Sequence, residues 1–273
     1  GLGYIGSVVA LLAVLLLQKF FGEFTPFSFM AVAVFYGAVG ALACRGLARL
    51  DWQHPPTATL EDRAAARVPV PQRGAFLLGA WLVMECVTVA ILFFSIFAKH
   101  EVALTTLQVG LTMLLVNVIA CPATILGGRL LSHWPGPWRL GLTIPIWVLA
   151  IALLIGWADS WAKVLVVAAL CGLVLGNTQS YLRALYSSIT SRQQAGGQFG
   201  AYALTTQAAT FLGVFLYGWL SDVLGSQTLP MAVLGVMLVV GWALVAWGAG
   251  GGRQELAPAG SKRTAGRTPV EDL

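Results

Sequence analysis

A single acidic residue, Glu85, stands in the middle of a long apolar stretch of this sequence. Residues 75–84 before it and 86–94 after it carry no charge. A charge at the centre of a bilayer costs roughly 2.5–3.5 kcal/mol on insertion scales, so such residues usually face a partner or a water-filled cavity. Dry surroundings favour the neutral acid and water favours the carboxylate, which makes Glu85 a candidate for proton uptake and release. The plainer interpretation is a protonated carboxyl that is merely hydrogen-bonded inside a helix bundle.

Further polar residues interrupt other apolar stretches and are candidates to line a path for a solute or a proton. Thr88 follows Glu85 by three residues, which places both on the same face of a helix. Taken singly, such residues are more often interhelical hydrogen bonds than ligand contacts, and a terminal arginine is often an interfacial anchor. Together with the central carboxyl they predict a polar path consisting of Glu85, Thr88, Asn117, Gln179, Arg183, Thr206 and Gln207.

The composition indicates which elements must position these residues. Hydrophobic residues make up 58% of the chain and charged residues 10%, with a mean hydropathy of +0.81. Soluble domains carry about 25% charged residues, so the chain is expected to be an integral, multi-pass, all-α membrane protein. Apolar windows long enough for a bilayer predict eight transmembrane helices, at residues 2–17, 27–44, 75–98, 104–126, 140–157, 164–182, 199–220 and 229–247.

The basic residues predict the orientation in the membrane. If the eight spans alternate in direction, only Lys19, Lys99 and Lys163 fall on one side. The other 13 of the 16 Lys and Arg residues then share the opposite side, which the positive-inside rule assigns to the cytosol. The net charge of +5 is therefore explained by topology, and we expect no nucleic-acid partner. The cytosolic set is Arg45, Arg49, Arg63, Arg67, Arg73, Arg129, Arg139, Arg183, Arg192, Arg253, Lys262, Arg263 and Arg267.

The loop lengths predict how the spans are grouped. A long polar loop separates two spans from six closely connected ones, a pattern typical of transporters built from two six-helix halves. We expect residues 1–44 to be the last two helices of the N-terminal half, 45–73 a cytosolic linker, 74–248 the C-terminal six-helix half and 249–273 a disordered cytosolic tail. Gly1 is then a truncation point, and the missing N-terminal helices of the same protein are partners. Gly172 and Gly176 predict a close contact between two helices.

Several segments together resemble the major facilitator superfamily and, within it, the vacuole effluxer (autophagy-related) branch with its bacterial relatives. Glu85 stands where that family has an intramembrane Asp, and Asn117 where it usually has Gln. The resemblance implies a twelve-helix fold with alternating access around a site at the membrane midplane, and amino acids as solutes. It rests on Leu2-Gly3-Tyr4-Ile5-Gly6-Ser7, Met84-Glu85-Cys86, Gly127-Gly128-Arg129, Gln179 with Arg183, Phe199-Gly200-Ala201-Tyr202, Leu212-Gly213 and Gly225-Ser226-Gln227.

The sequence also departs from that family. The loop containing Gly128, Arg129 and Ser132 resembles the superfamily's cytosolic gating motif, but Ser132 stands where Asp is usual. Gly197 replaces an expected Glu and Gln207 an expected Lys. These changes affect residues that could pair or couple ions, so they bear on how transport would be driven.

Two functions from different classes follow. The leading hypothesis is a secondary active transporter of small polar solutes, with amino-acid efflux and proton coupling at Glu85, in the plasma membrane or a vacuolar membrane. The alternative is a non-transporting receptor or assembly subunit that keeps the transporter fold. An enzyme is not supported, because the sequence has neither His-Glu-x-x-His nor Gly-x-Ser-x-Gly and no phosphate loop. We expect no cofactor or metal; the expected partners are a small-molecule solute and the lipid bilayer.

Overall fold

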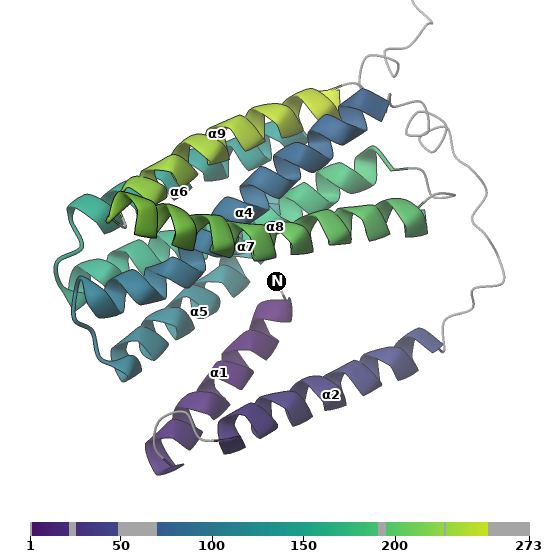
Figure 1. The fold of residues 1–273 in the computed structure, drawn as a ribbon. Helices are drawn as coiled ribbons and strands as arrows, with labels where there is room; N and C mark the ends of the chain where they lie inside the picture. Colours follow the sequence, from purple (N-terminus) through teal and green to yellow (C-terminus); the bar gives the residue numbers. More distant parts are fainter. Residues whose placement is uncertain (1, 22–25, 49–69, 191–194, 227, 251–273) are drawn as a thin grey trace, which may run out of the picture.

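The computed structural model describes residues 2–21, 26–48, 70–190, 195–226 and 228–250 (Figure 1). Within these ranges the chain forms eight helices and no strands. The predicted linker lies mostly, and the predicted tail almost wholly, outside the described residues. The helices are α1 (Leu2–Phe21), α2 (Pro26–Ala48), α4 (Val70–His100), α5 (Thr106–Leu130), α6 (Gly136–Gly156), α7 (Trp161–Ser188), α8 (Ala195–Leu224) and α9 (Thr228–Gly250).

The predicted all-α membrane fold is confirmed. Six helices of the described chain, α4 to α9, are long and apolar enough to cross a membrane, whereas α1 and α2 contribute shorter apolar helical stretches. The helices extend past the predicted apolar windows; α8, for example, covers 195–224 instead of 199–220. This extension has a simple cause, since a hydropathy window marks the hydrocarbon core while backbone hydrogen bonding continues into the interfacial region.

Helices α4 and α9 contact each other through a glycine seam, formed by Gly79, Gly241 and Gly248. A Cβ atom added at Gly79 would lie 2.6 Å from the carbonyl oxygen of Gly241. One added at Gly248 would lie 2.6 Å from the carbonyl oxygen of Gln72. The two backbones therefore touch directly at both ends of the contact, which is how helices in membranes gain van der Waals energy in the absence of a hydrophobic driving force.

A second close contact joins α5 and α7. A Cβ atom on Gly172 would lie 2.7 Å from the carbonyl oxygen of Val116, and one on Gly176 would collide with the hydroxyl of Thr124. The close helix approach predicted from Gly172 and Gly176 is therefore confirmed.

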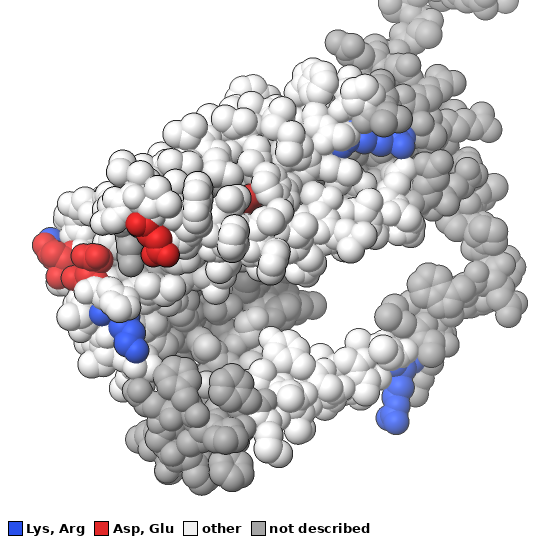
Figure 2. Space-filling view, viewed as in Figure 1, with Lys and Arg blue, Asp and Glu red and all other residues white. Residues whose placement is uncertain are grey.

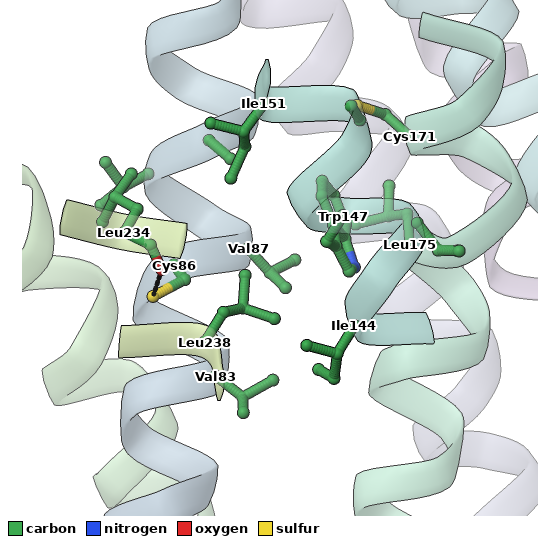
Figure 3. Packing of buried hydrophobic residues seen from close by; sticks show 14 of the residues in the cluster. Val83, Cys86, Val87, Ile144, Trp147, Ile151, Cys171, Leu175, Leu234 and Leu238 are labelled. Atoms are coloured by element: carbon green, nitrogen blue, oxygen red, sulfur yellow. Dashed lines mark hydrogen bonds between the residues drawn. The ribbon is translucent and has the colours of Figure 1, made fainter. Parts of the chain in front are cut away.

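The interior of the bundle is mostly apolar, and several of its polar atoms are bonded to nearby backbone or side chains. Figure 3 shows the Cys86 thiol of α4 directed at α9, where it donates to the carbonyl oxygen of Leu234 at 3.3 Å. Elsewhere in the core the fully buried Trp147 of α6 donates through Nε1 to the hydroxyl of Thr178 on α7, at 3.0 Å. These bonds tie α4 to α9 and α6 to α7 while satisfying groups that hydrocarbon cannot hydrate.

Local sequence signals set where two of the helices begin. Thr105 and Gln108 form a capping box at the start of α5, in which each side chain accepts from the other residue's backbone N–H. Gly225 has φ +59° and makes the turn from α8 to α9, a backbone conformation that side-chain-bearing residues rarely adopt. The capping box fixes the start of α5, and the Gly225 turn lets the chain reverse direction between α8 and α9.

Helices α1 and α2 form an arm at the side of the six-helix bundle (Figure 1). Helix α1 packs on α5, and α2 packs on α1. The side chains described on α2 are mostly exposed, including Val34 at 68% and Leu42 at 66%. In Figure 2 most charged side chains of the bundle lie toward its ends, and the broad band between them is white except for one small acidic patch.

Candidate functional site

Glu85 lies on the face of α4 that packs against α8. Gly213 lies opposite, so close that a Cβ atom added there would be 2.6 Å from Glu85 Cγ and 2.8 Å from Val89 Cγ2. Two turns further along the same face, the rings of Phe93 and Tyr217 meet with centroids 3.6 Å apart. The spacing of four residues on both helices thus creates one contact face, and the absence of a side chain at Gly213 leaves room for the carboxyl.

The carboxyl of Glu85 is buried and incompletely bonded. The residue is only 2% exposed, and its Oε2 atom has no hydrogen-bond partner among the described residues. It lines a cavity of about 180 Å³ that lies between α8 and α9. Burying a carboxyl oxygen without a partner costs desolvation free energy that no hydrogen bond offsets. This cost distinguishes Glu85 from the hydroxyls of the bundle that are hydrogen-bonded.

The other predicted path residues are distributed over α4, α5, α7 and α8. Thr88, Asn117, Gln179 and Thr206 are half-buried, whereas Arg183 and Gln207 are exposed. Asn117 Nδ2 donates to the carbonyl oxygen of Met113 within its own helix at 2.9 Å, and Thr206 Oγ1 donates to that of Tyr202 at 3.1 Å. Within the described chain no hydrogen bond joins Glu85 to any of them. Their membership of one path stays a prediction.

A second polar region, which sequence reasoning did not assemble, lies where α1, α5 and α7 meet. Asn177 of α7 is buried and donates across to the carbonyl oxygen of Ala123 on α5 at 3.2 Å. Its Oδ1 atom and the hydroxyls of Tyr4 and Tyr181 are buried without hydrogen-bond partners in the described structure. We call Tyr4, Asn177 and Tyr181 the α1–α5–α7 polar cluster.

Small residues lie against this cluster. A Cβ atom on Gly127 would lie 2.9 Å from the hydroxyl of Tyr181, and one on Gly176 would lie 2.8 Å from the ring of Tyr4. The predicted path residue Arg183 is exposed and belongs to the same helix as Asn177 and Tyr181. Tyrosines in apolar stretches read as core or interfacial residues, so the sequence offered no separate signal for Tyr4 and Tyr181.

The predicted gating-loop residues meet in one turn at the end of α5. Ser132 Oγ donates to the carbonyl oxygen of Arg129 at 2.8 Å, so the serine is satisfied within its own turn. Arg139, at the start of α6, donates through Nε to the carbonyl oxygen of Trp134 at 2.7 Å and through its other nitrogen to that of Ser132. Gly128 is exposed, with open space around its Cα. The two hydrogen bonds of Arg139 therefore hold the loop between α5 and α6 in place.

The described residues contain no cluster of three or more His, Cys, Asp or Glu side chains that could hold a metal ion. Long apolar helices, glycine-mediated contacts and a buried carboxyl within the described ranges define the class as a multi-pass helical membrane protein.

Comparison with known proteins identifies the family. Residues 1–214 match the model of the Major Facilitator Superfamily, and the chain belongs to this family of membrane transporters. It is similar to Autophagy-related protein 22-1 of Phaeosphaeria nodorum, with 33% identity over 86 residues. That match covers 32% of this chain and 15% of the fungal protein, so the chain spans well under two thirds of its relative's length. The resemblance inferred from the motifs is confirmed.

Proposed function

We propose that this chain is the larger part of a secondary active transporter that moves small polar solutes by alternating access. Membership of the Major Facilitator Superfamily supports transport, and the resemblance to vacuole effluxers favours amino-acid efflux. In this proposal α1 and α2 end the first half, α4 to α9 form the second, and further helices of the same protein cover the exposed apolar side chains of α2. Alternating access then consists of rocking between the two halves.

The observation that carries the proposal is the buried carboxyl of Glu85, whose Oε2 atom has no hydrogen-bond partner in the part of the chain that the structure describes. In a dry state such a group is stable as the neutral acid, and in a water-filled state as the carboxylate. A conformational change that alternately wets and dries Glu85 therefore binds and releases a proton, and the proton gradient biases the two states.

The test is transport by the full-length protein, reconstituted in vesicles with a radiolabelled amino-acid mixture. Glu85→Gln mimics the protonated form permanently, so we expect it to abolish pH-driven accumulation while preserving exchange at equal concentrations. Glu85→Ala is expected to impair both if the carboxyl also touches the solute. Glu101→Gln is the matched control, because Glu101 is an exposed acid at the end of the same helical segment. An unaltered pH dependence in Glu85→Gln would reduce Glu85 to a packing residue.

The gating loop is the observation that supports the alternative function, a receptor or assembly subunit with a transporter fold. Ser132 cannot supply the negative charge of the usual Asp, and its hydroxyl is bonded within its own turn. This alternative predicts that the wild-type protein exchanges no amino acid even at equal concentrations. Exchange by the wild type that also requires Glu85 excludes it.

A further inference from the structure

The cavity beside Glu85 opens on the side of the bundle where α8 and α9 diverge. Both helices pack mainly on α4 and touch each other little. The cavity is bounded by α4 at its inner wall and by the two diverging helices at its sides. Its lining is Glu85, Gly213, Leu216, Tyr217, Trp219, Leu220, Pro230, Val233, Leu234 and Met237.

The mouth of this cavity lies among side chains that face outward from membrane-spanning helices. Leu216, Trp219 and Val233 line the cavity and are 42%, 57% and 44% exposed. They belong to α8 and α9, both of which are long and apolar enough to span the bilayer. A molecule dissolved in the hydrocarbon phase therefore reaches the cavity sideways, without crossing the polar loops.

The chemistry of the lining selects the ligand. Most of the lining is aliphatic or aromatic, which favours an apolar body, and Glu85 is the one acidic residue of the lining, with its carboxyl buried at the inner wall. A volume of about 180 Å³ suits a single aromatic ring with a short chain, because benzene fills an apolar cavity of about 150 Å³ in another protein. A cationic donor on such a molecule complements an otherwise unpaired carboxyl in low dielectric.

We propose that this cavity is a binding site for small lipophilic amines that enter from the bilayer, with the ammonium on Glu85 and the ring between α8 and α9. The site shares Glu85 with the proposed function but requires no transport, so binding and coupling can fail separately. A bound ammonium occupies the oxygen that a proton would otherwise take. Amine and proton therefore compete for Glu85.

The test is equilibrium binding of radiolabelled 2-phenylethylamine to the full chain in nanodiscs of zwitterionic phosphatidylcholine, which has no net charge. n-Propylbenzene, which has the same shape without the amine, serves as competitor. We expect saturable binding of the amine and weaker binding of the hydrocarbon. Glu85→Gln should weaken amine binding about tenfold or more, since a hydrogen bond to a charged group is lost. Competition by n-propylbenzene should not change in that variant.

Two further variants keep the test decisive. Val233→Trp narrows the mouth without touching Glu85, so it should weaken the binding of both probes even if Glu85→Gln fails to fold. Glu101→Gln should leave both unchanged. The proposal is overturned if wild type shows no saturable binding, if n-propylbenzene binds as tightly as the amine, or if either Glu85→Gln or Val233→Trp leaves amine binding unaltered. Equal binding of the two probes would assign the cavity to lipid acyl chains.

Discussion

Among the described residues, two regions that bury polar atoms without hydrogen-bond partners do so differently. Around Glu85, one carboxyl oxygen stands alone in an apolar contact between α4, α8 and α9. In the α1–α5–α7 polar cluster, an amide oxygen and two phenol hydroxyls share a contact that also holds an interhelical hydrogen bond. The first region concentrates one ionisable group beside free volume, and the second distributes neutral groups in a tight contact.

This difference separates a place for a ligand from a place for helix recognition. A neutral amide or phenol buried without a hydrogen bond costs about 1–3 kcal/mol, whereas an ionised group at that depth costs more. The cavity leaves free space beside Glu85. At the polar cluster, Gly127 and Gly176 are in such close contact with their neighbours that no space is left. The comparison therefore favours the Glu85 region for the proposed ligand site and the polar cluster for helix pairing.

The largest effect is expected at the tight contact. In Gly176→Ala the new Cβ atom would collide with the hydroxyl of Thr124, a β-branched residue that is stiff in a helix, and would lie 2.8 Å from the ring of Tyr4. We expect a loss of about 3 kcal/mol in the free energy of unfolding, measured by denaturation of the purified chain in detergent. Gly156→Ala, with open space around it, should be neutral. A neutral Gly176→Ala would mean that the contact is looser than described.

A smaller effect is expected at the Glu85 region. Gly213→Ala places a Cβ atom 2.6 Å from Glu85 Cγ and 2.8 Å from Val89 Cγ2, but the flexible carboxylate chain can move into the adjoining cavity. We expect a cost of about 1 kcal/mol in the same denaturation assay, together with weakened amine binding. Gly218→Ala on the same helix has open space and is the control. A cost as large as that of Gly176→Ala would erase the difference between the two regions.

The smallest effect concerns a polar pair in water, which shows by contrast what burial contributes. Between α6 and α7, Lys163 donates to Asp159 Oδ2 at 2.6 Å, and this hydrogen bond holds the pKa of Asp159 below its usual value of 3.8. Its contribution is therefore present above that pH and is lost as the pH falls through the lowered pKa. Lys163→Met should lower thermal stability slightly at neutral pH and not in strong acid. A large difference at neutral pH would contradict the weakness expected of exposed pairs.

Much of the fold could be predicted because the membrane insertion of its helices depends on runs of apolar residues, which the sequence shows directly. Apolar windows located every helix of the described chain, and the pair Gly172 and Gly176 indicated a close contact because only small residues allow backbones to meet. The helix ends were missed by several residues, as for α8. Hydropathy does not record where hydrogen bonding stops; that depends on local caps, such as Thr105 with Gln108.

The candidate site was predictable only in part. Glu85 is conspicuous because an apolar neighbour would have been cheaper, and its burial was predicted. Its neighbours were not, since Gly213 lies 128 positions away along the chain and nothing in one sequence shows which helix faces it. The same holds for Tyr4, which reaches α7 from another helix. Tertiary contacts between distant apolar segments depend on side-chain shape, and periodicity alone does not specify which faces meet.

The glycine seam between α4 and α9 has a mechanical consequence. Where two backbones touch, no side chain can rotate to absorb a displacement, so the contact is stiff, and tilting one helix must carry the other with it. Within the described residues, no glycine of α8 lies against the backbone of α9 in this way. Force applied to the bundle is then transmitted by α4 and α9 as one lever, and α8 is the element free to change its angle. The cavity beside Glu85 would widen or narrow as the angle of α8 changes, while α4 and α9 stay fixed to each other at the glycine seam.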